Sequence, residues 1–229
     1  MAKQTYKALA ALLLYPSIEQ QQAADELLNV IKDEALLNDA QIAAIGQLTN
    51  HIASSDIYEL QSAYINLFDR GRSYSLHLFE HIHGESRDRG QAMVDLAATY
   101  QEAGLEINSN ELPDFLPLFL EYLSVADDEI VAEHLADAIN IIGVIGARLD
   151  EAESPYGAIF SALIALSPKN PNVAEIKKAI AVKEEQSLEY LDDQWEEKPA
   201  FGDAADCNSC DIAVQTTFLT PEEVGARNE

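Results

Sequence analysis

The stretch Tyr64–Leu96, YINLFDRGRSYSLHLFEHIHGESRDRGQAMVDL, carries the pattern that decides how this chain folds. Apolar residues recur at helical spacing up to Phe68, resume from Leu76 and resume again after the second of two breaks. Those breaks, at 69–72 and 83–84, are rich in glycine and charge. The stretch therefore predicts helical segments joined by short irregular connections.

The same helical spacing extends outward over most of the chain. Ser17 and Asp56 each precede an amphipathic series, and both residue types accept hydrogen bonds from the first backbone N–H groups of a helix. Pro113 stands where a helix accommodates proline in its first turn. No alternating strand pattern of convincing length occurs, so we predict an all-α fold. Beside the short segment from Leu76, helices are expected at about 6–14, 17–32, 39–53, 56–68, 86–104, 113–125, 128–152 and 155–166.

Net charge restricts the partners of this chain. Its 40 acidic residues outnumber 14 basic ones, for a formal charge of −26. Such a chain repels a nucleic-acid backbone and an anionic membrane surface and attracts basic peptides, although acidity also simply maintains solubility. We recognise no secretion signal and no apolar run of about 20 residues. We therefore expect a cytoplasmic protein that binds no nucleic acid and does not insert into a membrane.

Composition changes after about Lys183. From there onward 13 acidic residues accompany three basic ones, and apolar residues become sparse. Such a segment buries too little apolar area to offset the entropy lost on ordering. We expect a single helical domain at 1–182 and a flexible acidic tail at 183–229, with a short helix near Leu188–Trp195. Removing the tail should leave thermal stability largely intact.

Arginine and histidine are concentrated in the run 69–90. Four of the six arginines and three of the five histidines fall there, together with the acids Asp69, Glu80, Glu85 and Asp88. Arginine suits bidentate recognition of carboxylates, and interleaved acids and arginines form paired networks. Two interpretations stay open from the chemistry alone. The network shapes a ligand groove, or it consists of salt bridges between helices with no ligand.

The stretch 64–96 resembles the signature of the NarJ family, and so does the later Glu111–Leu123, ELPDFLPLFLEYL. Over roughly 3–170 the chain is similar to these assembly chaperones of respiratory nitrate reductase, which are relatives of the TorD-type chaperones. The resemblance implies a helical bundle that is not an enzyme and carries no cofactor of its own. It implies two kinds of partner: the catalytic (alpha) subunit of nitrate reductase with its N-terminal peptide, and molybdenum cofactor delivery proteins. Such a chaperone supports insertion of the molybdenum cofactor and an iron–sulfur cluster before the subunit docks at the membrane.

The positions that match the family's motifs are the candidate partner-binding residues. Apolar members, extended by Phe79 and Phe119, predict a groove, with a core role open for each. Gly71 and Gly84 are expected to permit the breaks. Four acids are expected to meet positive charges of the peptide: Glu80, Glu85, Asp88 and Asp114. Three arginines are expected to brace those acids: Arg70, Arg87 and Arg89. The complete candidate set is Tyr64, Leu67, Phe68, Asp69, Arg70, His77, Glu80, His83, Glu85, Arg87, Asp88, Arg89, Glu111, Pro113, Asp114 and Phe115.

Three further hypotheses compete with this one. His77, Glu80 and His81 fit the H-x-x-E-H pattern of a zinc peptidase, provided that they lie on a helix. The enzymes that use this pattern are much larger, and the resemblance accounts for the same residues, so no metal site is predicted. Cys207 and Cys210 form a lone C-x-x-C, interpreted as a bystander pair, with a transient metal or cluster contact left open. A helical adaptor that binds another basic amphipathic peptide is the main alternative function.

Overall fold

The helices begin where the sequence supplies a cap. The computed structural model describes residues 3–81, 87–107, 111–174 and 176, with the backbone alone at 87 and 88. In it, the Ser17 hydroxyl accepts a hydrogen bond from the N–H of Gln20 at 3.1 Å. The Asp56 carboxylate accepts from the N–H groups of Tyr58 and Glu59. Both predicted caps are confirmed, because these bonds satisfy N–H groups that have no partner within the helix.

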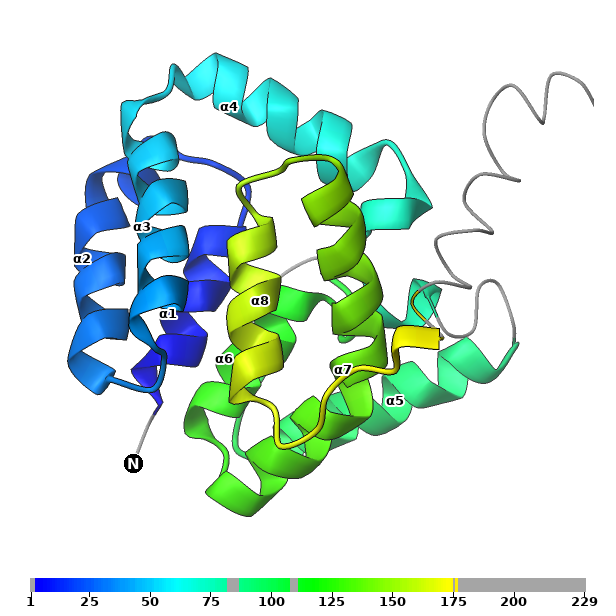
Figure 1. Ribbon diagram of the computed structural model, residues 1–229. Coiled ribbons are helices and arrows are strands. Elements are labelled where there is room, and N and C mark those ends of the chain that lie inside the picture. The colour runs from blue at the N-terminus through cyan, green and yellow to red at the C-terminus, as the bar shows by residue number, and fades with distance from the viewer. Residues whose placement is uncertain (1–2, 82–86, 108–110, 175, 177–229) are drawn as a thin grey trace, which may run out of the picture. The chain divides into compact units, whose positions relative to one another are not determined.

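In the described residues the structure consists of helices and helical turns, without a β-strand, and the all-α prediction is confirmed (Figure 1). The α-helices are Gln4–Leu13 (α1), Ile18–Glu34 (α2), Asp39–Ser54 (α3), Ile57–Tyr64 (α4), Arg87–Glu102 (α5), Leu116–Val125 (α6), Asp128–Glu151 (α7) and Gly157–Leu166 (α8). Short helical turns between α4 and α5 are the π-helix Ile65–Asp69 (η1) and the 3-10 turns Arg72–Tyr74 (η2) and Leu78–Glu80 (η3).

The helices pack in a chain of pairwise contacts that includes α1. Helix α1 contacts α2 and α6, while α2 pairs with α3, α3 contacts α8, and α8 contacts α7. The residues at helical spacing turn one apolar face of each helix inward, and Leu9, Ile45, Leu120 and Phe160 are fully buried. Burial of each such side chain stabilises the fold by about 1.5–3 kcal/mol. These contacts build one core from helices far apart in the sequence.

Three sequence predictions are wrong. Pro113 is not in the first turn of α6, which begins at Leu116 and holds Pro117 in that turn instead. In its described part, 76–81, the segment that resumes at Leu76 forms the 3-10 turn η3 and no α-helix. Gly71 has an extended backbone, φ −151° and ψ 141°, which other residues also adopt. Gly84, the tail 183–229 with its helix near Leu188–Trp195, and both cysteines lie outside the described residues.

Helix α7 is long and apolar enough to cross a membrane by length and composition alone. The prediction that no segment is apolar enough over this length is therefore corrected. In the fold the helix packs against α8 and η2, and residues such as Leu135, Ile142 and Leu149 are buried. The same apolar composition is what a helix at the centre of a folded core requires.

Candidate functional site

The connection between α4 and α5 is held by backbone bonds to the segment before α6. The N–H of Leu78 donates to the carbonyl of Asp114 at 3.0 Å, and the N–H of Leu116 donates to the carbonyl of Leu76 at 2.8 Å. Between these bonds, His77 and Phe115 form an isolated antiparallel bridge. The two stretches that carry the family resemblance therefore lie side by side. We call residues 65–81 together with 111–116 the junction.

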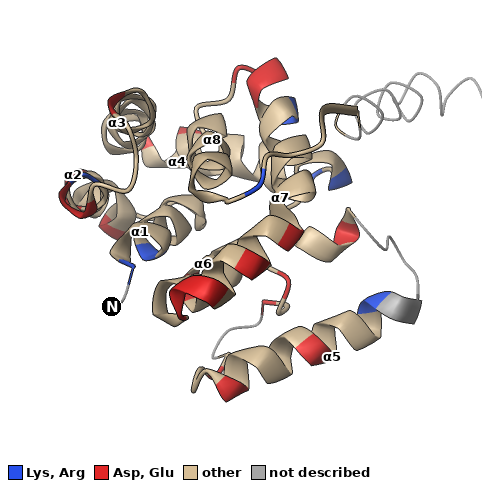
Figure 2. Ribbon diagram, turned by 60° about the horizontal axis from the view of Figure 1, so that its bottom comes forward, with Lys and Arg blue, Asp and Glu red and all other residues tan. Residues whose placement is uncertain are grey.

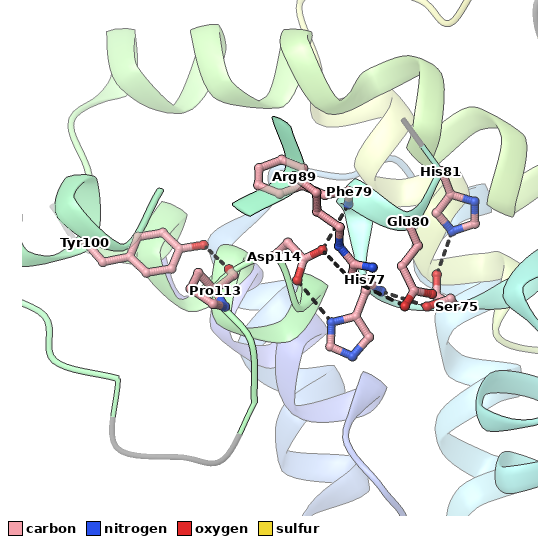
Figure 3. A network of polar contacts seen from close by, with 9 residues as sticks. All are labelled: Ser75, His77, Phe79, Glu80, His81, Arg89, Tyr100, Pro113 and Asp114. Carbon is pink, nitrogen blue, oxygen red and sulfur yellow. Dashed lines mark hydrogen bonds and ion pairs between the residues drawn. The ribbon is translucent and has the colours of Figure 1, made fainter. Parts of the chain in front are cut away.

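The carboxylate of Asp114 is the centre of a buried polar network (Figure 3). The side chain is completely buried, and Oδ2 accepts a hydrogen bond from the N–H of Phe79 at 3.1 Å. Oδ1 lies 3.2 Å from His77 Nδ1. The Arg89 guanidinium lies 3.7 Å from Asp114 Oδ2 and 3.4 Å from Glu80 Oε1. A buried carboxylate requires such partners, since removal from water without them is costly.

Two histidines of the junction have shifted pKa values. The hydrogen bond that His77 donates to the Asp114 carboxylate raises the pKa of His77 against the opposing effect of burial. Burial lowers the pKa of His81, whose Nε2–H donates to the carbonyl of Ser75 at 2.9 Å. The two rings thus flank η3 with opposite preferences for the proton.

A cavity of about 410 Å³ opens beside this network. Tyr64 lines this cavity, and its hydroxyl donates a hydrogen bond to the carbonyl of Leu13 at 2.7 Å. The Tyr64 ring lies 5.6 Å from that of Tyr15 and 4.8 Å from that of Phe68, and burial raises its pKa. The cavity is lined by Leu14, Tyr15, Tyr64, Phe68, Asp69, Leu76, His77, Glu111 and Phe115.

A second cavity of about 320 Å³ continues from the first, because both share Leu14, Glu111 and Phe115. On its far side the Tyr100 hydroxyl donates to the carbonyl of Pro113 at 2.9 Å, which ties α5 to the junction. Its remaining lining residues are Tyr100, Leu105, Glu106, Ile107, Leu118 and Glu121. We call the two cavities together the groove.

The groove collects many, but not all, of the predicted site residues. It is lined by Tyr64, Phe68, Asp69, His77, Glu111 and Phe115. Glu80, Arg89 and Asp114 belong to the network, where Arg89 braces two acids as predicted. Leu67 and Pro113 are half-buried outside the lining, and Arg70 is exposed. His83 and Glu85, and the side chains of Arg87 and Asp88, lie outside the described residues.

Asp114, Phe79 and Phe119 do not line the groove. Asp114 was expected to meet charges of a peptide, but its complete burial makes it an internal support instead. Phe119 is buried in the core, whereas Phe79 is half-buried and packs against the core.

The histidines of the H-x-x-E-H pattern flank a single 3-10 turn, so they do not share the face of an α-helix. Among the described residues, no group of three or more His, Cys, Asp or Glu side chains is placed to hold a metal ion.

Some residues that line the groove were not predicted from the sequence. Leu14 and Tyr15 follow α1 and keep about half of their surface exposed, at 42% and 48%. Pro16 follows them and disfavours helical backbone at Tyr15, so the sequence already indicated two apolar residues beyond the end of the helix. Leu118 and Glu121 give no such signal, because they differ from other α6 residues only in facing α5 and its following loop.

Comparison with known proteins decides the family. The family model described as nitrate reductase delta subunit matches residues 19–162. The chain belongs to this family. The predicted NarJ resemblance is therefore confirmed, and the delta subunit family fits the prediction that the chain is not an enzyme, since its named members below are chaperones.

Two relatives of this chain come from Escherichia coli (strain K12). NarJ, named a nitrate reductase molybdenum cofactor assembly chaperone, is 38% identical over 213 residues, covering 92% of this chain and 90% of NarJ. NarW, assigned the same role, is 38% identical over 210 residues, covering 91% of this chain and 87% of NarW. A solved structure assigned as a redox enzyme maturation protein, from Archaeoglobus fulgidus, matches with a TM-score of 0.52 and 19% identity. It covers 70% of this chain and 90% of that one, and it supports the all-α fold alone.

Proposed function

We propose that this chain is a cytoplasmic assembly chaperone that binds the apo catalytic subunit of a nitrate reductase. Its groove takes the N-terminal peptide of that subunit. While bound, the subunit stays competent for insertion of the molybdenum cofactor and an iron–sulfur cluster before it docks at the membrane. Molybdenum cofactor delivery proteins are further partners. The names of NarJ and NarW support the assembly role.

The observation that carries the peptide proposal is the chemistry of the groove. Its surface is apolar and aromatic, with Phe115 and Leu14 shared between the two cavities. Four acidic residues also line the groove: Asp69, Glu106, Glu111 and Glu121. No lysine or arginine is among the described residues that line it. Such a surface favours a segment with apolar anchors and basic residues, since apolar burial gives affinity and opposite charge speeds association.

The junction explains why such a groove keeps its shape without a ligand. Asp114 fixes the backbone at Phe79 and the ring of His77, while Tyr100 fixes the carbonyl of Pro113. Because these bonds are made within the chaperone, the peptide need not order the site when it binds. Preorganisation of this kind reduces the entropy cost of association.

The test is calorimetric titration of the full chain with the N-terminal peptide of the catalytic subunit. Affinity should fall as salt rises, because carboxylates contribute to binding. Glu111→Gln combined with Glu121→Gln should weaken binding by about 3- to 10-fold. The matched control is Asp25→Asn with Glu26→Gln, which removes the same charge from exposed positions on α2 and should leave affinity unchanged.

Two outcomes would contradict the proposal. If the N-terminal peptide does not bind the wild-type chain, the proposal that the groove binds this peptide is wrong. Equal binding of a scrambled peptide with the same composition favours the alternative of a general helical adaptor for basic amphipathic segments. Co-purification of the catalytic subunit with the chain is the corresponding test in cells.

A further inference from the structure

A cavity of about 450 Å³ lies at the C-terminal end of α6, and it shares no lining residue with the groove. It is bounded by the end of α5, the α6–α7 turn and the first turns of α7. We call it the notch, and define it by the lining residues Glu102, Tyr122, Val125, Asp127, Ile130 and His134. Its volume is large enough for one or two long side chains.

The apolar part of the notch is open to solvent. Val125 keeps 51% of its surface exposed and Ile130 keeps 38%, on either side of the turn at Ala126. Behind them the rings of Tyr122 and His134 meet edge to face with centroids 5.5 Å apart. The chain thus presents two exposed aliphatic side chains beside an aromatic pair. Covering these side chains would remove apolar area from water.

The electrostatics of the notch favour a cation. Glu102 and Asp127 line it, and burial together with the charges of Glu102 and Glu133 raises the pKa of Tyr122. Figure 2 shows acidic positions in red on α5 and on the helices beside it. No lysine or arginine is found among its described lining residues. An incoming ammonium or guanidinium would therefore meet carboxylates with no competing cation of the lining.

The chain itself places an ammonium at the edge of this site. Lys3 Nζ forms an ion pair with Asp128 and lies 3.4 Å from the carbonyl oxygen of Ala126, a lining residue of the notch. The Lys3 ammonium also lowers the pKa of Asp128. The α6–α7 turn thus already binds one lysine head group through a carbonyl and a carboxylate. The turn therefore provides oxygen acceptors that suit a cationic head group.

We propose that the notch is a second docking surface, for a partner segment in which a lysine or arginine stands next to a leucine-sized apolar side chain. The basic head group meets Glu102 and Asp127, and the apolar side chain covers Val125 and Ile130. A second copy of this chain is a poor occupant, because two chains of formal charge −26 repel each other. The site is separate from the groove, so it does not depend on binding of the N-terminal peptide there.

The probe is the tetrapeptide acetyl-Leu-Lys-Leu-Lys-amide, titrated into the ¹⁵N-labelled full chain and followed by amide chemical shifts. Shifts should concentrate at 122–134 and near Glu102 and should saturate. The glutamine analogue, acetyl-Leu-Gln-Leu-Gln-amide, should give much weaker shifts. Glu102→Gln with Asp127→Asn should raise the dissociation constant about three-fold or more, because two partner charges are lost. Val125→Ser should also raise it.

The matched control is Asp25→Asn with Glu26→Gln on α2, which makes the same charge change at exposed positions away from the notch. It should leave the dissociation constant unchanged. Equal weakening by both double variants would mean general attraction to an acidic chain and would overturn the proposal. Shifts confined to the groove, or no saturable shift at the notch, would overturn it too. Concentration-dependent broadening at the notch without peptide would identify a second copy as the occupant instead.

Discussion

The hairpin of α2 and α3 and the junction satisfy their polar groups in opposite ways. In the hairpin the helix caps come from neighbours in sequence: Ser17 caps α2, and Asn38 and Gln41 form a reciprocal capping box on α3. In the junction the partners are distant, as in the bonds from Phe79 and His77 to Asp114. The ends of both helices are therefore satisfied locally, and Gln21 adds a long-range contact by donating to the carbonyls of Ile52 and Ser55. The junction holds its form only when residues about 35 positions apart come together.

Asp114→Ala should produce the largest effect, because it breaks the junction at its centre. The substitution leaves the N–H of Phe79 and the Arg89 guanidinium without their buried acceptor. Loss of one partner from a buried charged network costs about 3–5 kcal/mol. Urea unfolding should show this loss, and peptide affinity should fall with it, since the same bonds position His77. The exposed Asp25→Ala on α2 is the control and should change stability by less than about 0.5 kcal/mol.

Ile45→Ala in α3 should cause a comparable loss of stability with a different consequence. Ile45 is completely buried, and truncation of such a side chain costs about 2–4 kcal/mol through lost burial and a residual cavity. At a temperature where the variant is still folded, peptide affinity should match that of the wild type. The comparison would break if Ile45→Ala weakened binding as strongly as Asp114→Ala, because the groove would then depend on general stability.

The same contrast shows what the sequence could and could not predict. The caps at Ser17 and Asp56 were predictable because the donors lie two or three residues away. The 3-10 turn η3 could not be predicted in this way. The segment from Leu76 has helical spacing, but its backbone forms hydrogen bonds with residues 114 and 116 instead. Arg148 shows the limit most clearly. It is a buried arginine in α7 that donates to the carbonyl of Ser73 at 2.9 Å, and no local pattern identifies that partner.

Within the site, the sequence identified residue types better than roles. Tyr64, Phe68, Phe115 and Glu111 were identified by resemblance, and all four line the groove. The sequence could not separate Asp114, which is buried, from Glu111, which is exposed, since both belong to one short acidic motif. Only the tertiary pairing of His77 with Phe115 decides which of the two carboxylates faces inward.

Ser17→Ala tests the hairpin by a smaller change. The hydroxyl supplies the acceptor for the first turn of α2, and loss of an N-cap costs about 1 kcal/mol. Peptide affinity should not change, because Ser17 does not line the groove. Ser17→Asp retains an acceptor and should recover most of the loss. No recovery in urea unfolding would show that the hydroxyl stabilises the chain by another contact.

The smallest expected effect is a pair of opposite pH dependences at the junction. His77 faces Asp114, Glu80 and Glu111, and its raised folded-state pKa means that it binds its proton more tightly in the folded chain. Its contribution to stability is present below the unfolded pKa of about 6.5 and is lost as pH rises through the folded pKa. Burial and the Arg148 charge lower the pKa of His81, so its contribution is present above about pH 6.5 and is lost as pH falls.

His77→Gln should therefore reduce the free energy of unfolding more at pH 5.5 than at pH 8.5, and His81→Gln should do the reverse. One titrating group changes this free energy by at most about 1.4 kcal/mol per pH unit, so urea unfolding at closely spaced pH values is needed. Ile45→Ala supplies the contrast from the hairpin, since a lost aliphatic contact lowers stability equally at every pH. If both histidine variants also gave curves parallel to the wild type, the proton would not distinguish the junction from the hairpin. Opposite slopes would show that the Asp114 network and the burial around His81 act on the two rings of one short turn in opposite directions.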